Sequence, residues 1–411
     1  MTAVPRPFAL DLSVWTRGSP QSTGELQRHE LCRIRHFQVG GNTNRNQLPF
    51  GRLVRDSIDI KAIQSWLSIC DHSHRCRDAG LASQRVNAPS ADFVFRVVDV
   101  ATRSVIDAPP GCVYAALSYV WGDLDLATLN ARMMPSMQGY MLVNEHSLPQ
   151  SVTDPVELCQ DLGIPYLWVD CLCIPQNNPH DKHVQINNME RIYSEAYLTI
   201  ASAMGFDANS GLPSVNPGSR TTQQLVLQSD AVSLITTTCN PELSMLTSQW
   251  YSRGWTFQEF LLSRRTLVFT AEQTLFCCSE AFWAEDTMPQ DHSPVQTSQL
   301  KRPEVIEVLR FLRADAMLSG SADDVFEKLY IPCVNMFTVR RLSRMTDALD
   351  AFAGIRRVIE PFLCDFFWGI PIQFLSYALL WYGDYQKNRR NHAYAKSAAR
   401  IPLLVMDRLR I

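Results

Sequence analysis

The stretch that decides the fold is "VYAALSYVW", residues 113–121. It is almost wholly apolar and shows no alternation with polar residues, which is typical of a strand buried on both faces of a parallel sheet. Similar runs follow in "PYLWVDCLCI" (165–174), "YLTIAS" (197–202) and "TLVFT" (266–270). We therefore expect four buried strands in one parallel sheet.

Helical patterns separate these strands. "DPVELCQDLG" (154–163) is typical of a short helix with Asp154 as its cap, "HVQINNMERIYSEA" (183–196) is amphipathic, and "SQWYSRGWTFQEFLLS" (248–263) is a third helix. Strands alternating with helices predict an α/β fold with a parallel sheet covered by helices on both faces.

In such folds, the polar residues of binding and catalytic sites lie where the carboxyl ends of the strands meet the amino ends of the helices. The segments 118–123, 170–176 and 253–259 each lie at such a junction. We expect these three segments to be neighbours, although they are far apart along the chain.

The chain of 411 residues divides into five expected parts. They are an irregular amino-terminal segment (1–60), a Cys/His-containing extension (61–110), the α/β domain (111–285), a linker (286–303) and a mostly helical carboxyl-terminal region (304–411).

The charge composition gives no support to several classes of function. With 38 basic and 41 acidic residues and no long run of one charge, nothing points to nucleic acid or to an anionic membrane surface. The amino terminus lacks a signal-peptide pattern, so we expect a cytoplasmic protein whose cysteines stay reduced. The uncharged stretch 366–383 contains Gly369 and Pro371, which favours a buried turn and helix over a membrane span.

Cys70, His72, His74 and Cys76 are side chains that zinc accepts. Their packing into seven residues is unlike the two separated ligand pairs of a zinc finger, so we expect structural packing beside Trp66 rather than metal binding. The pairs at 171–173 and 277–278 are expected to be buried, apolar-like cysteines on strands. The sequence has no phosphate loop, GxGxxG, HExxH or GxSxG motif.

Two carboxylates remain as candidates. Asp170 ends an apolar strand, where an acid serves either as a helix cap or in an active site. Glu259 lies four residues after Trp255 in "RGWTFQE", so the two share a helix face. Most helical glutamates are solvated, but the neighbours of Glu259 are apolar, and a buried carboxylate must be paired, for example with Arg253, or functional.

Three long blocks resemble a known family. "YAALSYVWGD" (114–123), "YLWVDCLCIPQ" (166–176) and "RGWTFQE" (253–259) are similar, in order and spacing, to the blocks of the fungal heterokaryon incompatibility (HET) domain. The resemblance covers about residues 61–290, whereas the ending after Arg400 departs from the family pattern and suggests a truncated tail. It implies a role in nonself recognition and programmed cell death, with other incompatibility proteins or further copies of the chain as partners.

The HET domain is in turn remotely similar to the TIR fold, and this resemblance implies a flavodoxin-like parallel sheet. Catalytic TIR domains cleave the nicotinamide–ribose bond of NAD with a helical glutamate. This resemblance implies Glu259 as the catalytic carboxylate, with NAD as substrate rather than cofactor. Ser118, Trp121, Asp170, Arg253 and Trp255 would line its pocket. The alternative is a non-catalytic signalling or oligomerisation module that recruits a separate death effector.

Overall fold

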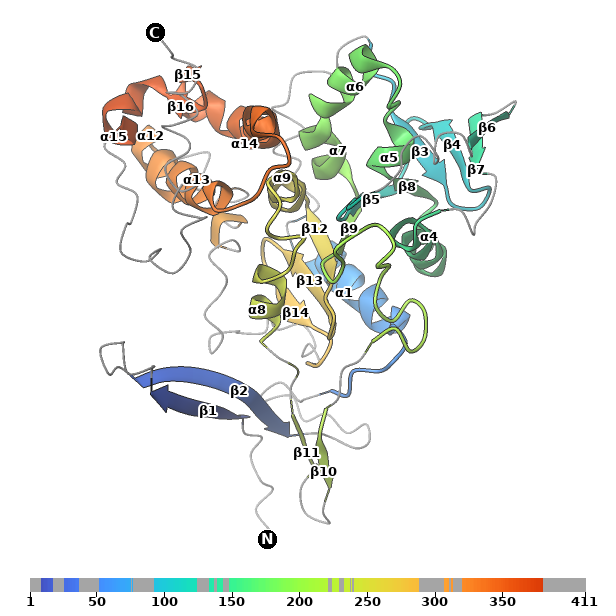
Figure 1. The fold of residues 1–411 in the computed structure, drawn as a ribbon, viewed down its shortest axis with the longest axis vertical. Helices are drawn as coiled ribbons and strands as arrows, with labels where there is room; N and C mark the ends of the chain where they lie inside the picture. Colours follow the sequence, from blue (N-terminus) through green and yellow to red (C-terminus); the bar gives the residue numbers. More distant parts are fainter. Residues whose placement is uncertain are drawn as a thin grey trace.

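A computed structural model gives the fold of the chain (Figure 1). The structure describes residues 9–17, 26–36, 52–74, 76, 92–123, 133–136, 139–142, 148–220, 224–228, 233–236, 238, 240–287, 307–309, 312 and 320–379. Residues 288–303, which are most of the linker predicted over residues 286–303, and the tail after Arg400 lie outside these residues.

A mixed ten-stranded sheet forms the centre of the molecule. Its spatial order is β14 (Phe282–Ala284), β13 (Thr274–Cys278), β12 (Arg265–Phe269), β9 (Leu198–Ser202), β5 (Tyr114–Ser118), β8 (Tyr166–Trp168), β3 (Arg96–Asp99), β4 (Ser104–Asp107), β7 (Gly139–Leu142) and β6 (Met133–Ser136). The four strands from β12 to β8 are parallel, as the sequence predicts. The flanking strands pair antiparallel, so the predicted α/β class is confirmed for a sheet whose parallel part is its middle.

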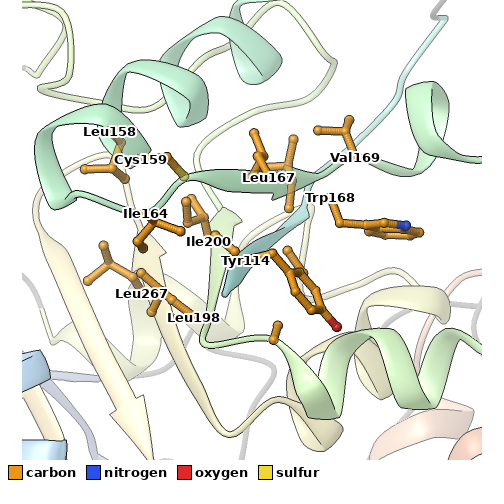
Figure 2. Close-up of a cluster of buried hydrophobic side chains, with 14 of the residues drawn as sticks. Tyr114, Leu158, Cys159, Ile164, Leu167, Trp168, Val169, Leu198, Ile200 and Leu267 are labelled. Atoms are coloured by element: carbon orange, nitrogen blue, oxygen red, sulfur yellow. The ribbon is translucent and has the colours of Figure 1, made fainter. Parts of the chain in front are cut away.

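Apolar side chains alternate between two cores, one on each face of this sheet. In β12, Leu267 and Phe269 belong to the first core and Val268 to the second. Figure 2 shows part of the first core, where Leu158 of the helix that precedes β8 lies in the same cluster as Leu198. Burial on both faces explains why these strands are continuous apolar runs.

Helices cover both faces (Figure 1). The first core includes residues of α1 (Ile60–Ser73) and α4 (Gln150–Leu162), which contact each other. The second core includes residues of α9 (Trp255–Leu262) and α14 (Ala348–Leu363). Both α9 and α14 contact α7 (Met189–Glu195), so α9 lies within a helical layer that combines the α/β domain with the carboxyl-terminal region.

The expectation that residues 1–60 are irregular is wrong. Strands β1 (Ala9–Arg17) and β2 (Leu26–His36) form an antiparallel pair. They join β11 (Ser233–Thr236) and β10 (Val226–Gln228) in a second, four-stranded sheet. The pairing partner of β2 lies about 200 residues further along the chain, and such a long-range contact leaves no local pattern in the sequence.

Three local predictions also need correction. The strand predicted over residues 165–174 ends at Trp168, and α5 (Asp170–Cys173) follows because the amides of Leu172 and Cys173 turn back to the carbonyl of Val169.

The helix predicted over residues 183–196 is two helices, α6 (Pro179–Ile186) and α7, separated at Asn187 and Asn188. The helix predicted over residues 248–263 begins only at Trp255 and is preceded by α8 (Pro241–Leu246) and a turn.

Asp154 does not cap a helix. Helix α4 begins four residues earlier, and the Asp154 carboxylate instead accepts hydrogen bonds from the amide of Leu212 at 2.6 Å and from Nδ2 of Asn216 at 2.8 Å. It therefore ties α4 to the loop after β9. The predicted helix end at Gly163 is confirmed, with the left-handed φ of 72° that favours glycine.

The carboxyl-terminal region is mostly helical where the structure describes it. Its elements are α12 (Ala322–Val325), the π-helix η3 (Phe326–Tyr330), α13 (Ile331–Thr338), η4 (Met345–Asp347), α14, β15 (Phe366–Phe367), β16 (Ile370–Pro371), η5 (Ile372–Phe374) and α15 (Leu375–Leu379). Among the described residues, no helix has the length and apolar character needed to cross a membrane.

Candidate functional site

The candidate site lies at the carboxyl end of the central parallel strands. β5 ends at Ser118, Asp170 follows β8, and α9, which carries Glu259, contacts β5. Parallel strands end at the same edge of a sheet, so side chains far apart in the sequence meet there. The three segments expected to be neighbours contribute side chains that bond or interact across this edge.

Glu259 forms the buried floor of the site. Its carboxylate accepts a hydrogen bond from the hydroxyl of Ser118, and that hydroxyl oxygen accepts one from Nε1 of Trp250 at 2.7 Å. Glu259 is 6% exposed and Ser118 is 1% exposed. The Ser118 hydroxyl therefore links the indole N–H of Trp250 to the Glu259 carboxylate, which is almost fully shielded from water.

Burial raises the pKa of Glu259 to about 7, and the nearby charge of Asp170 acts in the same direction. The hydrogen bond from Ser118 and the charge of Arg253 lower the pKa but do not offset the loss of solvation. Tyr193 also interacts with Glu259, while its hydroxyl donates to the carbonyl of Leu117 at 2.9 Å. Near neutral pH the carboxyl is thus balanced between its two protonation states.

Asp170 and Trp121 form a more open rim. The Asp170 carboxylate accepts from Nε1 of Trp121 at 2.8 Å and from the amide of Cys171 at 2.7 Å. Burial raises the pKa of Asp170 to about 6 despite these bonds and the opposing charge of Arg253. Trp121, Asp170 and Arg253 all keep part of their surface exposed. The site therefore has a partly exposed rim beside a buried floor.

Arg253 supplies a positive charge to both carboxylates. Its Nη1 donates to the carbonyl of Tyr119 at 2.8 Å, which holds the guanidinium beside the end of β5. The charge lowers the pKa of Asp170 and of Glu259. Because its side chain is half-buried, this cation is also within reach of an anionic ligand.

A segment of the carboxyl-terminal region holds the start of α9. The amide of Arg341 donates to the carbonyl of Ser252 at 2.6 Å, and the amide of Gly254 donates to the carbonyl of Arg341 at 2.7 Å. A Cβ on Gly254 would lie 2.4 Å from Cδ2 of Leu342, so a larger residue at 254 would force the Leu342 side chain to move. We call these main-chain contacts the backbone clasp.

The clasp is reinforced by a buried cation. The guanidinium of Arg340 lies over the rings of Tyr251 and Phe257, 3.9 Å and 4.7 Å from their centroids. It also donates to the carbonyl of Arg253 at 3.2 Å. Burial lowers the pKa of Arg340 to about 10, whereas the charge of Glu259 acts to raise it. The carboxyl-terminal region therefore contributes to the electrostatics of the site.

The structure brings together Ser118, Trp121, Asp170, Arg253 and Glu259 through bonds or mutual charge effects. Trp255 is half-buried and packs against both apolar cores. Sequence reasoning missed Trp250 and Tyr193. An indole in the polar stretch before "RGWTFQE" could have pointed to Trp250, whereas Tyr193 looked like one residue of an apolar helix stripe.

The Cys/His candidates are only partly brought together. Cys70, His74 and Cys76 converge, and Cys278, which we expected to be an ordinary core residue, joins them. His72 does not, because it is exposed and its Nδ1 lies 2.7 Å from the carbonyl oxygen of Ser68.

Comparison with known families bears directly on this geometry. The family model described as "Heterokaryon incompatibility protein (HET)" matches residues 114–259. This segment is a HET domain. The match runs from the first residue of β5 to Glu259 within α9. It therefore includes Ser118, Asp170 and Glu259. It links the protein to heterokaryon incompatibility.

The folded unit is larger than the matched segment of the HET domain. Strands β3, β4 and β12 to β14 lie outside the match but belong to the same sheet. No curated protein and no solved structure matches the chain.

Proposed function

We propose that this HET-domain protein acts in fungal nonself recognition and the resulting programmed cell death by hydrolysing NAD at the nicotinamide–ribose bond. Glu259 is the proposed catalytic carboxylate. The observation that carries the proposal is its position: the carboxyl is buried at the carboxyl ends of β5 and β8, bonded to Ser118, and its pKa is raised to about 7. Such a shift at a buried junction is characteristic of functional carboxylates.

The chemistry suits an ionised carboxylate in a dry site. As the C1′–N bond breaks, its electron pair leaves with neutral nicotinamide, and positive charge develops on the ribose. Glu259 would stabilise that charge, an effect that low local dielectric strengthens. Water then adds to C1′ and gives its proton to the carboxylate, which releases it to solvent. The products are nicotinamide, ADP-ribose and one proton.

The rim offers groups of the kinds that the rest of the substrate requires. Arg253 would provide a partly exposed cation for a pyrophosphate, and Trp121 would provide an aromatic surface for a base. Asp170 would hold Trp121 through the 2.8 Å bond from the indole Nε1. Trp255 would contribute to the wall from the first turn of α9, and Ser118 would orient the catalytic carboxylate.

A non-catalytic signalling module is the second candidate, and one observation favours it. The Glu259 carboxylate is engaged by Ser118, which is itself bonded to Trp250, so the network joins β5 to the helical layer as a structural element would. Under this candidate the domain would assemble with other incompatibility proteins or with itself and recruit a separate death effector.

Nicotinamide release by the purified, concentrated full-length chain distinguishes the two. We expect Glu259→Gln to lower the rate by at least about 100-fold, because a positioned acid or base contributes that much. Glu157→Gln is the matched control, since Glu157 is exposed on α4. Release by the Glu259 variant at the wild-type rate would remove Glu259 from catalysis. No release by folded, assembled wild-type protein would favour the signalling module.

A further inference from the structure

Four side chains of the types that bind zinc converge at the end of α1. Cys70, His74, Cys76 and Cys278 each offer one ligand atom, and these atoms all lie within 4.8 Å of one another. The first three come from the end of α1 and the residues after it, and the fourth is the last residue of β13. The cluster thus joins parts of the chain about 200 residues apart.

The local backbone explains how so short a spacing supplies three ligands. Cys70 lies in the last turn of α1, and His74 is the C-cap, where its amide donates to the carbonyl of Cys70 at 3.2 Å. The backbone becomes extended at His74, with φ −107° and ψ 148°, which separates Cys76 from the helix. Helical spacing and the following bend therefore bring three ligands to one point, which the sequence spacing alone did not reveal.

The distances between the ligand atoms are compatible with tetrahedral coordination of one zinc ion. Zn–S and Zn–N bonds of about 2.3 Å and 2.0–2.1 Å place a sulfur and a nitrogen ligand about 3.6 Å apart in a tetrahedron. Nδ1 of His74 lies 3.4 Å from Sγ of Cys278. With all four ligand atoms within 4.8 Å, small side-chain rotations complete the geometry.

The surroundings stabilise thiolates and exclude water. Sγ of Cys278 accepts from the amides of Ala281 at 3.2 Å and Glu280 at 3.4 Å, and backbone donors of this kind support a ligating sulfur. The three cysteines are almost fully buried. The guanidinium of Arg265, which is 2% exposed and pairs with Asp71, interacts electrostatically with Cys70 and offsets negative charge there.

We propose that Cys70, His74, Cys76 and Cys278 bind one structural Zn²⁺ ion. Three sulfurs and one imidazole are a preferred zinc ligand set, and four protein ligands leave no position for a substrate. Binding releases the three thiol protons to solvent and gives a complex with one net negative charge, next to the cation of Arg265. The ion would join the end of α1 to the end of β13, where the turn to β14 begins.

Metal analysis of the full-length, tag-free protein tests the proposal. Native mass spectrometry and elemental analysis should find one zinc per chain in wild-type protein. Cys278→Ser and His74→Ala should hold none. His72→Ala and Cys277→Ala are the controls and should keep one, because His72 is exposed and Cys277 packs in the second core.

A second measurement does not depend on the folding of variants. Replacement of the zinc by Co²⁺ in wild-type protein should give the visible bands of a tetrahedral site and strong thiolate-to-cobalt charge transfer. Wild-type protein that neither contains zinc nor binds it stoichiometrically would overturn the proposal. So would a cobalt spectrum without thiolate bands, zinc retained by the Cys278 variant, or a mass two units low from a disulfide within the cluster.

Discussion

Burial of Glu259 lowers the stability of the folded protein and, in the proposed function, places a carboxylate where it can act on the substrate. The folded protein favours the protonated acid, because burial raises its pKa from an ordinary 4.5 to about 7. Between these pH values the folded chain binds more protons than the unfolded chain, so the unfolding free energy falls as the pH rises. Well above pH 7 the buried charge is fully present and its cost is greatest.

Replacing Glu259 by glutamine should therefore stabilise the protein at alkaline pH. The pKa difference corresponds to about 3 kcal/mol, so Glu259→Gln should exceed wild type by up to about that amount at pH 8. The difference should shrink toward pH 5. Urea unfolding at both pH values measures it, with Glu157→Gln as the control. A constant difference across this range would show that Glu259 is not the titrating group.

At the scale of elements, the start of α9 depends on the backbone clasp. Helix α9 has no side-chain cap at its amino end, and Gly254 at the N-cap has helical φ and ψ of −64° and −44°. The clasp instead satisfies Gly254 by donation of its amide to the carbonyl of Arg341. The need for glycine at 254 comes from the nearness of Leu342 and not from an unusual φ.

Gly254→Ala should consequently destabilise the protein by about 1–3 kcal/mol, the usual cost of overpacking. The same change made in a Leu342→Ala background should cost much less, because the atom 2.4 Å from the added Cβ is then absent. Chemical unfolding of the two single variants and the double variant gives this comparison. Equal costs in both backgrounds would contradict the steric explanation.

The elements that could be predicted from sequence are those decided locally. "YAALS" and "TLVF" form β5 and most of β12 because a short continuous apolar run is typical of a doubly covered strand. The convergence of Ser118, Asp170 and Glu259 followed from the rule for parallel strand ends. Long-range partners carry no such signal, which is why Trp250, Cys278 and the strands β1 and β2 were missed or misassigned.

At the scale of the whole molecule, the carboxyl-terminal region is packed against the HET domain rather than appended to it. Gly354 of α14 approaches α7 and α9 so closely that an added Cβ would lie 2.7 Å from Cβ of Glu190 and 2.8 Å from Cδ1 of Leu262. Arg357 pairs with Glu190, whose side chain is 3% exposed. Figure 1 shows α14 next to α9 and α7.

Arg357→Met should destabilise the protein by about 3 kcal/mol, because it leaves the buried Glu190 carboxylate without its cation. Adding Glu190→Gln should recover part of that loss. Arg356→Met is the matched control: its pair with Glu360 is more exposed, so we expect less than about 1 kcal/mol. Urea unfolding of the full-length wild type and of these three variants measures the differences. Equal losses at 356 and 357 would refute a buried pair.

The backbone clasp also has an evolutionary consequence. Peptide groups make the two hydrogen bonds of residue 341, so mutation can change its side chain while the contact persists. Position 254 is more constrained, because any larger residue meets the side chain of Leu342. The side-chain constraint therefore lies in one pair, Gly254 and Leu342. We therefore expect a residue larger than glycine at position 254 to be accompanied by a residue smaller than leucine at position 342.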